Sequence, residues 1–139
     1  MSVRVLETEP GEPCNHGFMD DLESFFWLIL WSVSAHLEPD QSPTVAAQKT
    51  INMLEQADLD QILFGKMALF NECADDGTEI KRRLLKFQHP WACNDRVPSL
   101  IHSMGKYFNK ARLRDNSPTD AFPTVVDMLY KALYRDLSE

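Results

Sequence analysis

The sequence predicts an all-α domain, and three observations support that fold class. Val, Ile and Thr never alternate with polar residues over a stretch long enough to form a strand. Residues 22–31 are almost continuously apolar and follow an acidic pair, as expected for a helix that the rest of a domain surrounds. Several later segments place apolar residues three and four positions apart. With 139 residues the chain can bury a core without disulfides, so we expect one domain, residues 1–139.

The central helix is expected over about Asp21–Leu37, within residues 20–37. Asp20 and Glu23 have the three-residue spacing of a capping box, in which each side chain bonds the backbone N–H of the other residue. Every residue of Phe25–Trp31 is apolar, so we expect this helix to be buried on all sides. The apolar stretch is about ten residues long, whereas a bilayer crossing needs roughly 20, which argues against a membrane span.

Residues 43–137 are expected to form helices around the central one. Ser42 and Pro43 have the order of a cap and a first-turn proline, which predicts a helix over 44–56. Asp58 is expected to begin the next helix. Its apolar residues, at three- and four-residue spacing, are Leu59, Ile62, Leu63, Met67 and Phe70.

The C-terminal half is expected to contain three further helices. Residues 75–78 form a predicted turn that ends in Thr78 as a cap, because the remainder of a calcium-binding loop does not follow. The helix that starts there is expected to bury Ile80, Leu84 and Phe87. Two prolines bracket a predicted loop that contains Trp91. The remaining predicted elements are helices over 100–108 and 124–134 and a linker over 116–123.

Composition narrows the classes of partner and the compartment. The chain carries 21 acidic and 14 basic side chains, a net charge of −7, which disfavours nucleic acid and anionic membranes. Residues 81–83, Lys-Arg-Arg, are the densest basic cluster and are expected to lie on a solvated helix face. The N-terminus has no charged and then apolar leader, and three cysteines fit a reducing compartment. We therefore expect an intracellular protein, cytoplasmic or nuclear.

No catalytic or cofactor-binding residue is assigned from motifs. The five glycines lie at least six residues apart, so the chain has no glycine-rich phosphate loop, and it has no Gly-x-Ser-x-Gly motif. Four soft ligands for zinc exist in Cys14, His16, His89 and Cys93, but their spacing is not that of a recognised zinc site. A small metal-binding helical protein is therefore kept as an alternative, and no residue is assigned as a metal ligand.

Residues 20–31, Asp-Asp-Leu-Glu-Ser-Phe-Phe-Trp followed by Leu-Ile-Leu-Trp, resemble the central helix of the large lobe of fungal-type protein kinases. Casein-kinase-type enzymes have a similar Asp-Asp-Leu-Glu-Ser. Residues 1–6, Met-Ser-Val-Arg-Val-Leu, resemble the family's degenerate Ala-Pro-Glu motif, which closes a kinase activation segment. Residues 1–19 would then be the end of that segment and its connecting loop. The resemblance covers 1–37 most closely and continues over 59–110 as helix spacing.

The resemblance implies roles for several residues. Asp21 lies at the position of the kinase aspartate that holds the backbone of the catalytic loop, although a plain helix cap explains it equally well. Ser2, Val3 and Arg4 belong to the Ala-Pro-Glu-like segment. Arg4 stands where kinases usually place a glutamate that pairs with an arginine on a later helix, which leaves the partner of Arg112 or Arg114 open. The resemblance also implies that two tryptophans, Trp27 and Trp31, pack in the interior of the lobe.

The fold that the resemblance implies is the helical lower half of a protein-kinase-like C-lobe. The glycine-rich loop, strand lysine, His-Arg-Asp and Asp-Phe-Gly motifs precede the Ala-Pro-Glu position and are absent here. We expect a truncated lobe that acts as a scaffold and platform for protein substrates. It is expected to be inactive alone and to lack the ATP and magnesium sites of the complete family. The alternative is a pseudokinase-derived protein-interaction module.

The expected partner is the missing N-terminal kinase half or another protein. The catalytic loop would normally cover the side of the central helix that carries Asp21 and some of Phe25, Leu28 and Trp31. Without that cover we expect self-association through this side, or coverage by residues 1–19 folded back over it.

Overall fold

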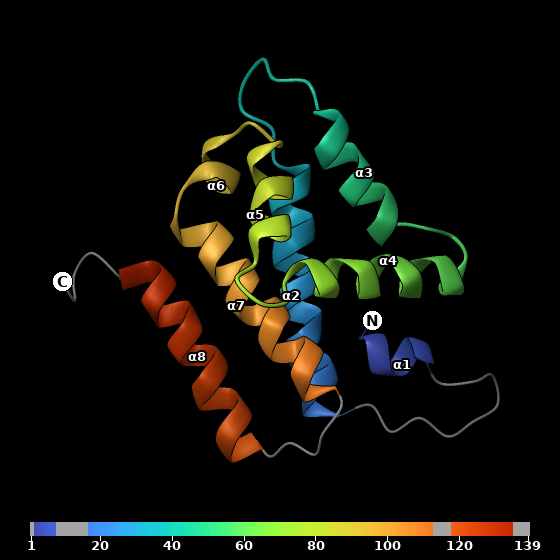
Figure 1. Ribbon diagram of the computed structural model, residues 1–139, viewed down its shortest axis with the longest axis vertical. Coiled ribbons are helices and arrows are strands. Elements are labelled where there is room, and N and C mark those ends of the chain that lie inside the picture. The colour runs from blue at the N-terminus through green and yellow to red at the C-terminus, as the bar shows by residue number, and fades with distance from the viewer. Residues whose placement is uncertain (1, 8–16, 113–117, 135–139) are drawn as a thin grey trace.

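The computed structural model describes residues 2–7, 17–112 and 118–134. Within these ranges the chain forms eight helices and no strand, which confirms the all-α fold class (Figure 1). The helices are α1 (Val3–Glu7), α2 (Phe18–Ala35), α3 (Val45–Leu54), α4 (Leu59–Glu72), α5 (Thr78–Leu85), α6 (Pro90–Cys93), α7 (Arg96–Ala111) and α8 (Pro118–Tyr134).

The central helix is α2, and the other helices are arranged around it. In Figure 1 it runs behind α5 and α7, with α3 and α4 on one side and α8 on the other. It packs directly against α3, α6, α7 and α8. Phe26 is fully buried at its middle, and its ring centroid lies 5.7 Å from that of Phe70 and 6.3 Å from that of Phe108. Helices α2, α4 and α7 therefore share one aromatic core.

The start of α2 differs from the prediction by three residues. Gly17 is the N-cap, and Asp20 is the third helical residue, whose Oδ2 accepts the Gly17 backbone N–H at 2.7 Å. The predicted box made Asp20 the cap and Glu23 its partner. That assignment is wrong, because Glu23 faces the N-terminal segment instead. The helix also ends at Ala35 rather than at Leu37.

Two of the predicted caps differ from the structure, and a third is confirmed. The N-cap of α3 is Thr44, whose hydroxyl accepts the Ala47 N–H, and not Ser42. Asp58 caps α4 as predicted, accepting two backbone N–H groups. Helix α5 already includes Thr78, and its N-cap is Gly77, which has a left-handed φ of 70°. The predicted inner residues of α5 are buried as expected.

Prolines lie in helices more often than the prediction assumed. Pro90 begins α6, and Pro98 lies in the first turn of α7, so the predicted loop over 90–98 is largely helical. The predicted linker over 116–123 is likewise wrong from Pro118 onward, where α8 begins. A first-turn residue has no intrahelical partner for its N–H, so proline costs little there. Pro123 lies deeper and leaves the Thr119 carbonyl without its usual partner, but Thr119 is exposed to water.

Candidate functional site

One side of α2 is exposed, contrary to the expectation of burial on all sides. Phe25 is 59% exposed, Leu28 56% and Trp31 39%. The core side of α2 carries Leu22, Phe26, Leu30 and Val33, at three- and four-residue spacing. This spacing leaves the three exposed side chains on the opposite side of the helix. Asp21 is exposed on the same side. These are the residues that the kinase resemblance expected to lack cover.

Helix α8 carries an exposed apolar stripe that the sequence analysis missed. Phe122, Val126, Tyr130 and Leu133 are between 45% and 65% exposed, and their spacing of four, four and three residues places them on one side of the helix. Another side of α8 buries Ala121 and Val125 in the core. The detectable signal was an excess of apolar residues, since α8 has more of them than one buried face requires.

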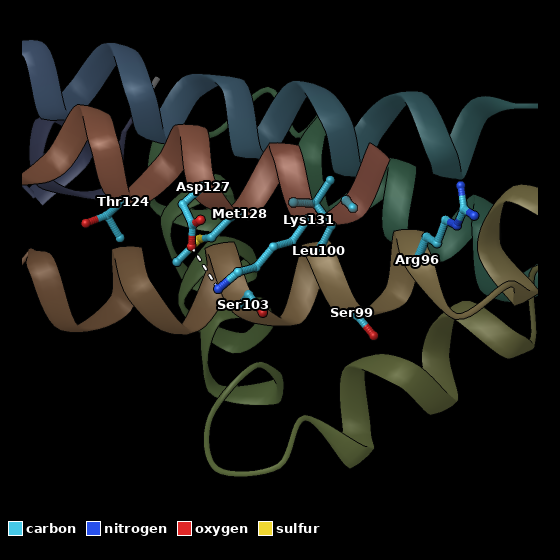
Figure 2. Close-up of a pocket in the computed structure, with 9 residues that line it drawn as sticks. Arg96, Ser99, Leu100, Ser103, Thr124, Asp127, Met128 and Lys131 are labelled. Carbon is cyan, nitrogen blue, oxygen red and sulfur yellow. Dashed lines mark ion pairs between the residues drawn. The ribbon is translucent and has the colours of Figure 1, made fainter. Parts of the chain in front are cut away.

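The stripe on α8 contacts α2 at Phe122, the N-terminal end of the stripe. The two helices pack together, and the ring centroids of Phe18 and Phe122 lie 5.9 Å apart. Both helices run in the same direction, and Figure 2 shows α8 alongside α2 and α7. The side of α8 that carries Thr124, Asp127 and Lys131 borders the hollow beside α7 (Figure 2). Phe122 of the stripe lies on another side of the helix, where it meets Phe18 of α2.

We call this set the apolar surface: Phe25, Leu28, Phe122, Val126, Tyr130 and Leu133. A large side chain exposes roughly 150–250 Å² when free, so half-exposure of these residues gives roughly 500 Å². That area is near the upper end of the range for monomeric proteins, where the largest apolar patch is often functional.

A hollow of about 580 Å³ lies between α7 and α8 (Figure 2). Leu100 and Met128 give it an apolar floor. Its polar side chains on α8 are paired within that helix. The Lys131 ammonium lies 2.9 Å from the Asp127 carboxylate, and the Thr124 hydroxyl donates to the Asp120 carbonyl. The hollow therefore presents no convergent group that defines a chemistry.

Residues 2–4 are fixed to the start of α2 by a buried carboxylate. Asp20 accepts the Ser2 hydroxyl at 2.6 Å, the Arg4 guanidinium and the Gly17 N–H. Burial opposes the charge of Asp20, but the hydrogen bonds from Arg4, Gly17 and Ser2 outweigh it and lower the pKa of this carboxyl. The Ala-Pro-Glu-like segment is thus tied to the central helix through Asp20. Arg112, whose partner the sequence left open, pairs with Glu7, and Arg114 lies outside the described residues.

A second buried polar group lies one turn further along α2. Glu23 accepts the Val3 N–H at 2.6 Å and the Trp27 indole N–H at 2.9 Å. The Lys66 ammonium of α4 lies 4.9 Å from the Trp27 ring centroid. Burial raises the pKa of Glu23 and lowers the pKa of Lys66. The positive charge of Lys66 opposes the shift at Glu23, and the negative charge of Glu23 opposes the shift at Lys66. Helix periodicity gave no sign of this pairing, because Lys66 lies on another helix.

The remaining predicted site residues are dispersed. Trp27 is buried as predicted, at 5% exposure, whereas Trp31 is partly exposed and donates its indole N–H to Glu55. The interior role expected for Trp31 is therefore wrong. The described residues 2–7 do not fold over the exposed side of α2, because α1 packs against α4 and Val3 bonds Glu23.

The zinc alternative loses one of its ligands to the fold. His89 is buried as the N-cap of α6. Its Nε2 lies 2.9 Å from the Val33 carbonyl, and its Nδ1 accepts the Ala92 N–H. Both ring nitrogens are therefore engaged. Cys93 is exposed, and Cys14 and His16 lie outside the described residues. Across the part of the chain that is described, no three His, Cys, Asp or Glu side chains cluster as metal ligands.

No protein-family model matches the chain, and neither a curated protein nor a solved structure matches it. The described helices include none that is long and apolar enough to cross a membrane.

Proposed function

We propose that the chain is the helical lower half of a C-lobe of the fungal-type protein kinase class, and that it works as a scaffold that binds a protein partner. The observation that carries this proposal is the apolar surface on α2 and α8. Its part on α2, Phe25 and Leu28, belongs to the side that the catalytic loop would cover in a complete lobe. The partner that fits it best is the N-terminal kinase half.

Two features of the structure support the assignment of α2 as the central helix of such a lobe. Phe26 and Trp27 lie inside a single core that α4 and α7 complete. Ser2, Val3 and Arg4, the Ala-Pro-Glu-like residues, are bonded to Asp20 and Glu23 on that helix. A segment that closes an activation loop has to be held against the scaffold, and these bonds supply that attachment.

Phosphate transfer is not part of the proposed role of these 139 residues. They contain no glycine-rich loop, no His-Arg-Asp and no Asp-Phe-Gly, which hold ATP and magnesium in kinases. The proposed task of the chain is to hold the remainder of the lobe and to present a protein-docking platform. In a pseudokinase-derived module the same apolar surface would bind a different protein.

The coding DNA upstream of Met1 provides the first test. An in-frame His-Arg-Asp followed by Asp-Phe-Gly is the expected result. An in-frame stop codon without those motifs would overturn the assignment to a kinase half and leave the interaction module.

Thermal denaturation with and without Mg-ATP provides the second test. A ligand that binds the native state raises the melting temperature. Since we expect the chain not to bind Mg-ATP, the expected result is an unchanged melting temperature. Saturable stabilisation at micromolar nucleotide would show that the chain carries a phosphate site that its sequence does not reveal.

A further inference from the structure

A second hollow, of about 870 Å³, lies between α3 and α5, on elements that contribute nothing to the apolar surface. Its lining is Pro43, Thr44, Val45, Ala46, Lys49, Glu72, Glu79, Arg82, Arg83, Lys86 and Gln88. Basic side chains from two helices therefore meet across one open space.

The charge of this hollow is opposite in sign to that of the chain. Four cations and two carboxylates line it, a net of +2, whereas the chain carries −7. Arg83 is neutralised by Glu72, but Lys49, Arg82 and Lys86 make no ion pair within the described residues. Arg82 and Lys86 are also four residues apart on α5, where like charges destabilise a helix.

The walls of the hollow are held in place by hydrogen bonds. Arg83 binds the Glu72 carboxylate through two nitrogens at 2.9 and 2.7 Å and donates to the Thr50 hydroxyl at 3.0 Å. This fork joins α5 to α4 and α3. The Gln41 amide also donates to the Gln88 carbonyl at the rim. Only the ends of the three free cations need to be ordered when an anion binds.

We propose that this hollow docks an acidic peptide segment of a protein. Charge complementarity favours several carboxylates, because the free cations come from both walls. The volume is many times that of a water molecule, about 30 Å³, so a single small anion would leave most of it unfilled. Nucleic acid is disfavoured, because no aromatic side chain lines the hollow for base stacking.

Fluorescence anisotropy with a labelled hexaglutamate peptide tests this proposal, and a hexaglutamine peptide serves as the neutral control. The intact chain should bind hexaglutamate saturably at low salt, and binding should weaken as salt is added. The triple variant K49Q/R82Q/K86Q should bind about tenfold more weakly, because three exposed charge pairs are lost. The matched triple variant K106Q/K110Q/K131Q, which removes the same charge elsewhere, should change affinity by no more than about twofold.

Three results would overturn the proposal: no saturable binding of hexaglutamate, equal binding of hexaglutamine, or equal losses in the two triple variants. Tighter binding of a hexathymidine oligonucleotide than of hexaglutamate would also overturn it. Circular dichroism of both triple variants confirms that they fold. The test does not depend on the proposed kinase scaffold, because the hollow and the apolar surface share no residue. The substitution Phe25→Ser on the apolar surface should therefore leave hexaglutamate binding unchanged.

Discussion

Replacement of Trp27 by alanine should destabilise the protein far more than the same change at Trp31, although both lie on α2 one turn apart. Trp27 is 5% exposed, and its ring centroid lies 4.7 Å from those of both Phe26 and Phe70. Truncation of such a residue costs about 3–5 kcal/mol. It also removes the indole donor of Glu23, whose burial already opposes its charge.

Trp31 contributes much less. Its side chain is 39% exposed, and its bond to Glu55 is on the surface. The loss of its remaining burial and of that bond should cost about 1–2 kcal/mol. The free energy of unfolding of a native domain is about 5–15 kcal/mol. The substitution Trp27→Ala should therefore bring the protein close to unfolding, whereas Trp31→Ala should not.

Urea denaturation followed by far-ultraviolet circular dichroism measures both values without relying on tryptophan fluorescence. The expected result is a large fall in midpoint for Trp27→Ala and a small one for Trp31→Ala, with similar m-values. Equal shifts for the two variants would refute the assignment of buried and exposed sides to α2.

Three further predictions concern the buried groups. Asp20→Asn should destabilise the protein at pH 7, and the difference should vanish as pH falls through the lowered pKa of Asp20, below its ordinary 3.8, because a depressed carboxyl stabilises only while ionised. A difference between wild type and variant that does not shrink as the pH falls below 3.8 would contradict this. In a Cys14→Ser background, iodoacetamide at pH 8 should modify exposed Cys93 but not Cys73, whose pKa burial raises to about 12; rapid loss of both thiols would count against the core packing. Gly105→Ala should cost about 1–3 kcal/mol in urea denaturation, because the new Cβ would lie 2.4 Å from the Cys73 Sγ, and an unchanged midpoint would argue against that close approach.

Local sequence signals predicted the longer helices, but not always their first residue, and they missed the short helices α1 and α6. The cap of α4 was predictable because the Asp58 carboxylate accepts the backbone N–H groups of residues only two and three positions further along the chain. Ser42 failed as the cap of α3 because Thr44, two residues on, offers the same hydroxyl. Prolines misled the prediction where they occupy a first turn, since a sequence alone does not distinguish a broken helix from a helix that begins there.

The candidate site depended on tertiary packing and was only partly predictable. An unbroken apolar run gives no direction, so the sequence predicted burial for Phe25 and Leu28, which are exposed. The kinase resemblance predicted that part of this side lacks cover, and Phe25 and Leu28 are exposed; the resemblance itself stays a prediction. The contribution of α8 and the contact of Lys66 with the Trp27 ring involve helices distant in sequence, which helix periodicity does not relate.

Co-elution of the chain with the proposed N-terminal kinase half, produced as a separate polypeptide, tests the central claim most directly. We expect a complex in size-exclusion chromatography that the double substitution Phe25→Ser with Val126→Ser abolishes. The matched pair Phe64→Ser with Val45→Ser, on α4 and α3, removes side chains that are 68% and 72% exposed but lie outside the apolar surface, and it should leave the complex intact. Absence of a complex, or its equal loss in both double variants, would contradict the claim that the apolar surface on α2 and α8 is the partner site.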